Sequence, residues 1–69
     1  MPVILGKVEM SPCIVSKAKY ALGLKTNKPH NNKKCSEHYW IKVINYLGEQ
    51  NELQHNIIEA ARNREDLFR

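Results

Sequence analysis

The sequence predicts a mainly α fold, a small three-helix domain with either a short β-strand or an extended arm at its N-terminus. Three segments carry apolar residues at helical spacing, and serine, proline and glycine stand at several of their expected ends. Only the first ten residues have a strand-like composition. With 42% hydrophobic and 26% charged residues, the chain has the composition of a folded protein rather than a disordered one.

The length of the chain limits its core. We interpret the 69 residues as one domain, 1–69. A chain of this size buries only roughly 60% of the surface that its unfolded form exposes. Small domains often depend on a metal, a disulfide or a second chain, and twofold dimers are the commonest assembly. We therefore expect a homodimer.

Residues 1–10 are the N-terminal strand or arm. They contain β-branched residues without clear alternation. A lone strand needs a partner, either elsewhere in this chain or in a second copy. No other segment is a clear strand candidate, which favours a second copy. Ribbon-type DNA-binding dimers share this outline of a strand followed by helices. However, Val3, Ile4 and Leu5 stand where base-reading polar groups would be needed.

The segment 11–23 contains the first helix, expected at 12–22. Ser11 is a natural N-cap, Pro12 suits the first helical position, and Gly23 suits a left-handed C-terminal stop. Leu24 is placed to pack back on the last turn. One apolar stripe results, made by Ile14, Val15, Ala18, Ala21 and Leu22.

The segment 24–35 is a long basic loop. It has almost no apolar residues and is rich in lysine, asparagine and turn formers. Connections of this length are uncommon in small domains and are often functional. This loop is therefore the first place to look for a binding site.

The segment 36–69 is expected to hold two helices, at 37–47 and 52–68. Ser36 caps the first of them, and Gly48 is interpreted as the break between them. Asn51 with Gln54 resembles a capping box at the start of the last helix. The predicted core of the domain comprises Ile14, Ala18, Leu22, Trp40, Ile44, Leu47, Leu53 and Ile57.

Charge is distributed unevenly along the chain. Residues 1–35 carry seven lysines against one glutamate, a net charge of +6, whereas residues 36–69 carry four cations against six acids, a net charge of −2. This asymmetry favours an anionic partner for the N-terminal half. The alternative is that the lysines only solvate a small domain.

Enzymatic and metal-binding patterns are weak. Cys13, His30, Cys35 and His38 are the residues to test for zinc, but they lack the two close pairs typical of zinc modules. No phosphate-binding glycine loop or metalloprotease pattern is present. We expect no enzymatic activity and no cofactor.

The apolar stretches of the sequence bear on the cellular compartment. No stretch is long and apolar enough for a membrane span or a signal-peptide core. We therefore expect a cytoplasmic protein that does not bind membranes. In that compartment the two cysteines are expected to be free thiols.

Two functions remain open, and both are non-enzymatic. In the first, an accessory protein binds DNA or RNA through lysines, which neutralise phosphates, and asparagines, which donate to phosphates or bases. In the second, the chain is a small inhibitor or adaptor that binds a protein, including an acidic one, through the apolar faces of the second and third helices. The nucleic-acid-binding residues would be Lys17, Lys19, Lys25, Lys28, Lys33, Lys34, Asn31 and Asn32.

Overall fold

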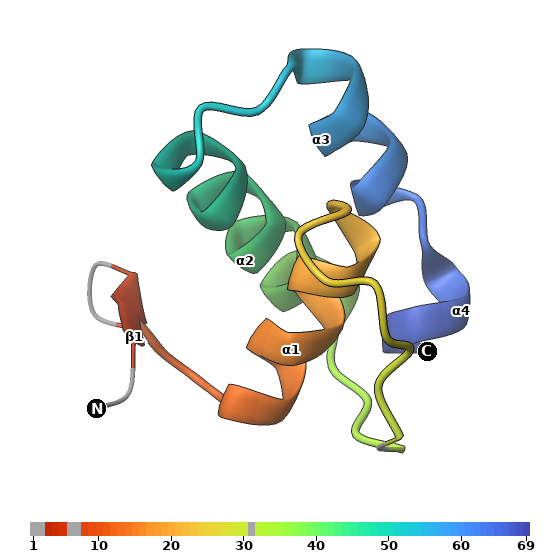
Figure 1. Ribbon diagram of the computed structural model, residues 1–69. Helices are drawn as coiled ribbons and strands as arrows, with labels where there is room; N and C mark the ends of the chain where they lie inside the picture. The colour runs from red at the N-terminus through yellow and green to blue at the C-terminus, as the bar shows by residue number, and fades with distance from the viewer. Residues whose placement is uncertain (1–2, 6–7, 31) are drawn as a thin grey trace.

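The computed structural model describes residues 3–5, 8–30 and 32–69, and it confirms a mainly α fold (Figure 1). Two short strands precede the helices, β1 (Val3–Leu5) and β2 (Val8–Met10). The helices of the described part are α1 (Pro12–Ala21), α2 (Glu37–Gln50), α3 (His55–Arg62) and α4 (Glu65–Phe68). No helix in these ranges is long and apolar enough to cross a membrane.

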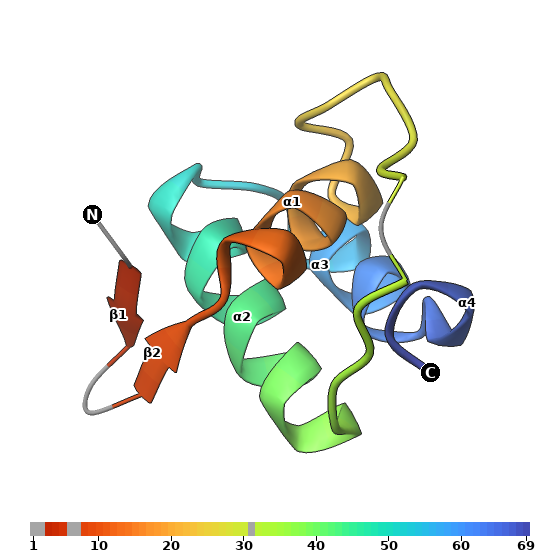
Figure 2. The same cartoon turned by 90° about the horizontal axis from the view of Figure 1, so that it is seen from below.

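The N-terminal segment forms a hairpin rather than one strand. β1 and β2 pair antiparallel, with Val3 opposite Met10 and Leu5 opposite Val8. The expectation that a strand here would need a second copy as its partner was therefore wrong, because the segment supplies both strands. The hairpin lies beside α2, on the side of α1 and α2 away from α4 and the loop 24–35 (Figure 2).

α1 has the ends that the sequence predicted. Ser11 is its N-cap and Pro12 its first residue. Gly23 has a φ of 79°, the left-handed conformation that a glycine adopts without strain. The Leu24 amide then donates to the Lys19 carbonyl at 2.8 Å, and the Gly23 amide donates to the Tyr20 carbonyl at 3.1 Å. This pair of bonds is a Schellman motif, which satisfies carbonyls that the helix end leaves free.

α2 begins as predicted but ends later. The Ser36 hydroxyl accepts a hydrogen bond from the Tyr39 amide at 3.2 Å, which confirms the N-cap. The predicted break at Gly48 was wrong, because the helix continues to Gln50. Gly48 lies inside α2 where α3 crosses it, and a Cβ there would meet the Ile58 side chain at 2.6 Å. The glycine therefore permits a close helix contact.

The turn after α2 also differs from the expected capping box. Asn51 is the C-cap of α2, and its amide nitrogen Nδ2 donates to the Leu47 carbonyl at 2.8 Å. Glu52 has a φ of 52°, and its neighbour Leu53 donates from its amide to the Gly48 carbonyl at 2.9 Å. This is a second Schellman motif, with a glutamate in the position that glycine usually takes.

The predicted helix 52–68 is two helices, α3 and α4. The chain turns at Asn63, the C-cap of α3, and α4 starts at Glu65. The turn lets Phe68 reach back to Trp40, and their rings stack with centroids 5.3 Å apart. Buried aromatic stacking of this kind stabilises the fold beyond the area it buries, so the break allows a contact that a straight helix would not make.

The core lies between α1, α2, α3 and α4. Trp40 is fully buried, and its indole Nε1 donates to the Ala61 carbonyl at 2.9 Å. Ile57 was wrongly predicted as core, since it is 37% exposed while its neighbour Ile58 is buried; Leu53 is only half-buried. The other predicted core residues are buried, namely Ile14, Ala18, Leu22, Trp40, Ile44 and Leu47.

Candidate nucleic-acid interface

The basic loop between α1 and α2 is tied to the helices. The Lys25 ammonium donates to the Ser16 hydroxyl on α1 at 3.1 Å. At the other end of the loop, the Cys35 amide donates to the Phe68 carbonyl at the end of α4 at 3.0 Å. Lys17 on α1 donates from its Nζ to the Lys33 carbonyl. These bonds hold the loop against α1 and α4.

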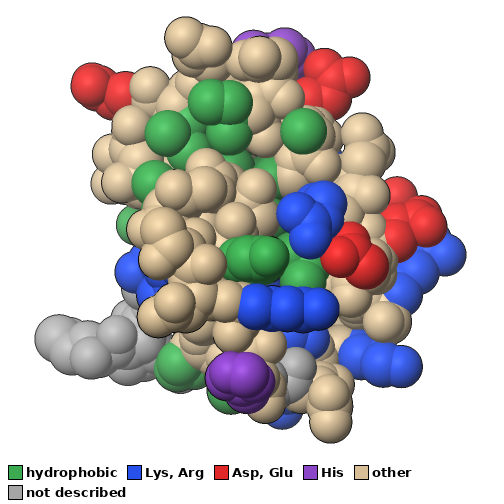
Figure 3. All heavy atoms as spheres, turned by 45° about the vertical axis from the view of Figure 1, so that its right-hand side comes forward, with side chains coloured by type: hydrophobic (Ala, Val, Ile, Leu, Met, Phe, Trp, Pro, Cys, Tyr) green, Lys and Arg blue, Asp and Glu red, His purple; other side chains and the backbone are tan. Residues whose placement is uncertain are grey.

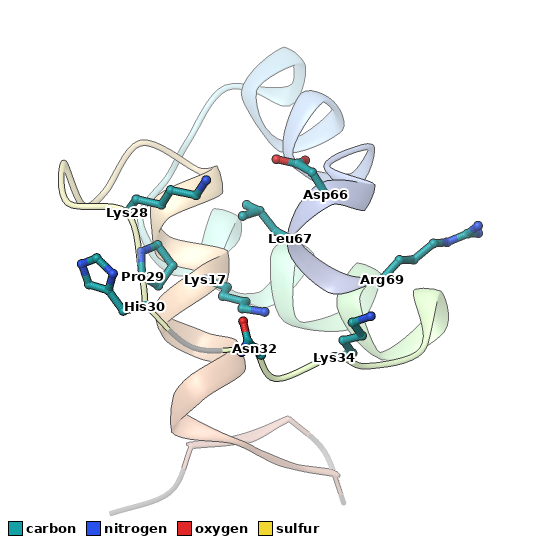
Figure 4. Close-up of a pocket in the computed structure, with 9 residues that line it drawn as sticks. All are labelled: Lys17, Lys28, Pro29, His30, Asn32, Lys34, Asp66, Leu67 and Arg69. Carbon is teal, nitrogen blue, oxygen red and sulfur yellow. The ribbon is translucent and has the colours of Figure 1, made fainter.

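The folded loop encloses a hollow of about 690 Å³ with α1 and α4 (Figure 4). This volume lies within the range of about 300 to 1,000 Å³ that is usual for small-molecule sites. In Figure 4 the amines of Lys17, Lys28 and Lys34 lie around the space in front of Leu67. The lining residues are Lys17, Lys28, Pro29, His30, Asn32, Lys34, Asp66, Leu67 and Arg69.

Lys17 differs from the other predicted phosphate contacts because it is buried, with 6% of its surface exposed. Among the side chains of residues 11–30 and 32–69, its ammonium has one hydrogen bond, to the Lys33 carbonyl, and no carboxylate at ion-pairing distance. A lysine ammonium has three donors. Lys17 is therefore a buried cation at the wall of the hollow, not part of an exposed lysine surface.

Asp66 is the one carboxylate among the lining residues, and Arg64 neutralises it. The guanidinium donates to both carboxylate oxygens, at 3.0 Å from Nε and 2.9 Å from Nη2. Hydrogen bonding by Arg64 lowers the pKa of Asp66 below its usual value, and Lys28 adds a smaller Coulomb effect. Arg64 also lies over the Tyr20 ring at 5.8 Å, which links α4 to α1. The hollow thus keeps its excess of positive charge.

Arg69 lines the hollow, but its guanidinium lies beside two carboxylates outside it. Its Nη2 lies 3.5 Å from a carboxylate oxygen of Glu37 and 3.6 Å from one of Glu65. In Figure 4 the guanidinium extends away from the three lysine amines. We therefore assign the positive charge of the hollow to the lysines.

The structure divides the predicted site residues into groups. Lys28, Lys34 and Asn32 line the hollow together with Lys17. Lys19 and Lys25 instead line a second, smaller hollow of about 490 Å³, next to exposed Leu24 and to Tyr46 and Gln50 of α2. Lys33 is exposed, and Asn31 lies outside the described residues. Lys25 and Lys28 both line a further hollow, which lies between these two groups.

The contribution of the C-terminal segment was missed. Asp66, Leu67 and Arg69 join the hollow from α4 and the residue after it. No local pattern in the sequence indicates this, because these residues reach the loop only through the turn at Asn63 and the stacking of Phe68 on Trp40.

The cysteines and histidines that were considered as zinc ligands do not lie together in the described part of the chain. Cys13, His30 and His38 are exposed, and in the part of the chain that the structure describes no three Cys, His, Asp or Glu residues are grouped as metal ligands. Partial burial raises the pKa of the Cys35 thiol, and nearby Lys17 opposes this only in part. Because the thiolate is the reactive form, Cys35 is a poor nucleophile at neutral pH.

Lysine and arginine side chains gather on the face that includes α4 and the loop, with acidic side chains beside some of them (Figure 3). Comparison of the chain with protein-family models, curated proteins and solved structures found no match. The function must therefore be argued from this face and its hollow.

Proposed function

We propose that this chain is a non-enzymatic accessory protein that binds nucleic acid through the basic loop and the hollow beneath it. One observation carries the proposal. Ammonium groups from the loop (Lys28 and Lys34) and from α1 (Lys17) surround one space, and the single carboxylate there is already paired with Arg64. Such an arrangement attracts an anion, and phosphate is the anion that nucleic acids present.

The chemistry of the hollow suits a nucleotide strand. Lysines neutralise phosphates, and the Asn32 amide can donate to a phosphate or a base edge. Pro29 and buried Leu67 add apolar surface for a sugar or a base. No arginine of the loop is available for bidentate reading of guanine, so we expect binding with little sequence preference.

The alternative of a protein-binding adaptor has less support. It relied on the apolar faces of the second and third helices, but Trp40, Val43 and Ile44 of α2 are buried in the chain's own core. Among residues 11–30 and 32–69, Leu24 and Ile57 are the large apolar side chains left exposed. An acidic protein could still meet the loop lysines, and it would then compete with nucleic acid.

Salt dependence of binding tests the proposal. With about four phosphate contacts, log affinity plotted against log salt for duplex DNA should have a slope of about −3 to −4, because each neutralised phosphate releases counterions. Replacing Lys34 by Gln should flatten the slope by about one unit. The double change Lys33→Glu and Lys34→Glu should abolish binding.

The matched control is Lys42→Gln, which removes one positive charge from α2 outside the lining of the hollow. It should leave the slope and most of the affinity intact. If no nucleic acid binds at low salt, or if Lys42→Gln weakens binding as much as Lys34→Gln does, the proposal fails.

A further inference from the structure

The side chain of Lys17 is buried although it carries a charged group. A charged side chain rarely lies inside a protein without an opposite charge, because burial removes the water that stabilises it. Among residues 11–30 and 32–69, Lys17 has one backbone carbonyl as its hydrogen-bond partner and no carboxylate partner. Lys28 and Lys34 line the same hollow as Lys17. An anion in the hollow would supply the missing negative charge.

We propose that this hollow binds a phosphate monoester, with Lys17, Lys28 and Lys34 as its cationic contacts. The inference rests on the proposed function and narrows it, since the preferred nucleic acid would be one that ends in a phosphate. A nucleoside monophosphate carries the same group and is the other source of this ligand.

Charge distinguishes a monoester from the internal phosphates of a strand. A terminal phosphate has a charge of about −1.5 to −2 near neutral pH and three free acceptor oxygens, whereas an internal phosphodiester carries about one negative charge. Three lysine ammoniums, with Asp66 already paired to Arg64, fit the more highly charged group. Hydrogen bonds between charged partners are also roughly twice as strong as neutral ones.

Space and polarity support the same ligand. The hollow of about 690 Å³ is far larger than the roughly 30 Å³ that one water molecule occupies in the liquid, so a phosphate with its attached sugar and base has room. Leu67 and Pro29 add apolar surface to the wall among the lysine amines. A nucleotide likewise combines an anionic group with a less polar sugar and base.

The experiment compares three probes on the full chain by fluorescence anisotropy and competition. They are a short single-stranded oligonucleotide with a terminal phosphate, the same oligonucleotide with a terminal hydroxyl, and a nucleoside monophosphate. The phosphorylated strand should bind about tenfold more tightly than the hydroxyl strand, as expected for a charged hydrogen-bonded group. Competition by the monophosphate alone would identify the free nucleotide as a ligand, and failure to compete would identify the strand end.

Two variants test whether the lysines of the hollow cause the preference for the phosphorylated strand. Lys17→Met removes the buried charge and keeps an apolar stem, and Lys34→Gln removes an exposed charge that the fold does not need. Both should lose the tenfold preference, with circular dichroism confirming the helical content, while Lys42→Gln should keep it. Because Lys17 also holds the Lys33 carbonyl, Lys34→Gln decides the matter if Lys17→Met alters the loop.

The outcomes separate this inference from the proposed function. Equal affinity for the phosphate and hydroxyl strands would overturn the monoester site and leave nucleic-acid binding standing. A tenfold preference that survives Lys34→Gln would also overturn it. If neither strand binds, both the proposed function and this inference are wrong.

Discussion

Replacing Gly48 by Ala tests the close approach of α2 and α3. The new Cβ would lie 2.6 Å from both Cγ1 and Cδ1 of Ile58, and Ile58 is itself buried. Inserting a methyl group into a filled core costs about 1 to 3 kcal/mol. Alanine is also the better helix former, by about 1 kcal/mol. The variant should therefore lose about 0 to 2 kcal/mol of unfolding free energy.

A neighbouring position isolates the steric cost. Glu49 follows Gly48 in α2 and is exposed, so comparing Glu49→Gly with Glu49→Ala measures the glycine-to-alanine gain without a clash. Subtracting that gain from the effect of Gly48→Ala should leave a penalty of about 1 to 3 kcal/mol. Urea unfolding followed by the fluorescence of Trp40, the only tryptophan, gives both values. If alanine stabilises position 48 as much as position 49, the close-contact argument is refuted.

Other substitutions test the core, the turn and the pH dependence. Ile44→Ala should lower the unfolding free energy by about 2 to 5 kcal/mol because the Ile44 side chain is fully buried, whereas Ile57→Ala should lower it far less. A loss below about 1 kcal/mol for Ile44→Ala would contradict the place of Ile44 in the core. Glu52→Gly should raise the stability measured in thermal melts by on the order of 1 kcal/mol or less. A non-glycine residue in the left-handed conformation costs roughly 1 to 2 kcal/mol, but glycine loses more chain entropy on folding, which offsets part of the gain. The Asp66 carboxyl has a lower pKa in the folded chain than in the unfolded one. Its contribution to stability is therefore present above the unfolded pKa and is lost as pH falls through the folded pKa. In an NMR titration, Arg64→Gln should raise the folded pKa of Asp66. The small size of the chain still favours a homodimer, and a strictly monomeric mass by light scattering at high micromolar concentration would exclude it.

Local signals in the sequence predicted the elements that depend on neighbouring residues. Ser11, Pro12 and Gly23 act within one turn of α1, and Ser36 acts within one turn of α2, so their side-chain and backbone chemistry sufficed. The sequence could not reveal what Gly48 does, because its role depends on Ile58 crossing it from another helix. A glycine has the same local preferences whether it ends a helix or admits a neighbour.

The face of α3 was ambiguous for a related reason. Ile57 and Ile58 are adjacent, and a long helix from 52 to 68 places Ile57 on the apolar stripe. The observed helix α3 runs only from His55 to Arg62, and its buried side carries Ile58 and Ala61. The basic loop stays a predicted site, and the wall that α4 adds to it depends on tertiary contacts that local periodicity does not contain.

The hydrogen bond between the Cys35 amide and the Phe68 carbonyl has a consequence for synthesis of the chain. Translation adds residues 66–69 after the loop lysines, so a chain that has not reached them carries the positive charge without the wall that shapes the hollow. Until Phe68 reaches Trp40, these lysines can attract phosphates only as a flexible polycation. Under the proposed function, selective binding would therefore begin only once α4 has docked, and a fragment ending at Asn63 should keep the charge of the loop but lose the proposed preference for a terminal phosphate.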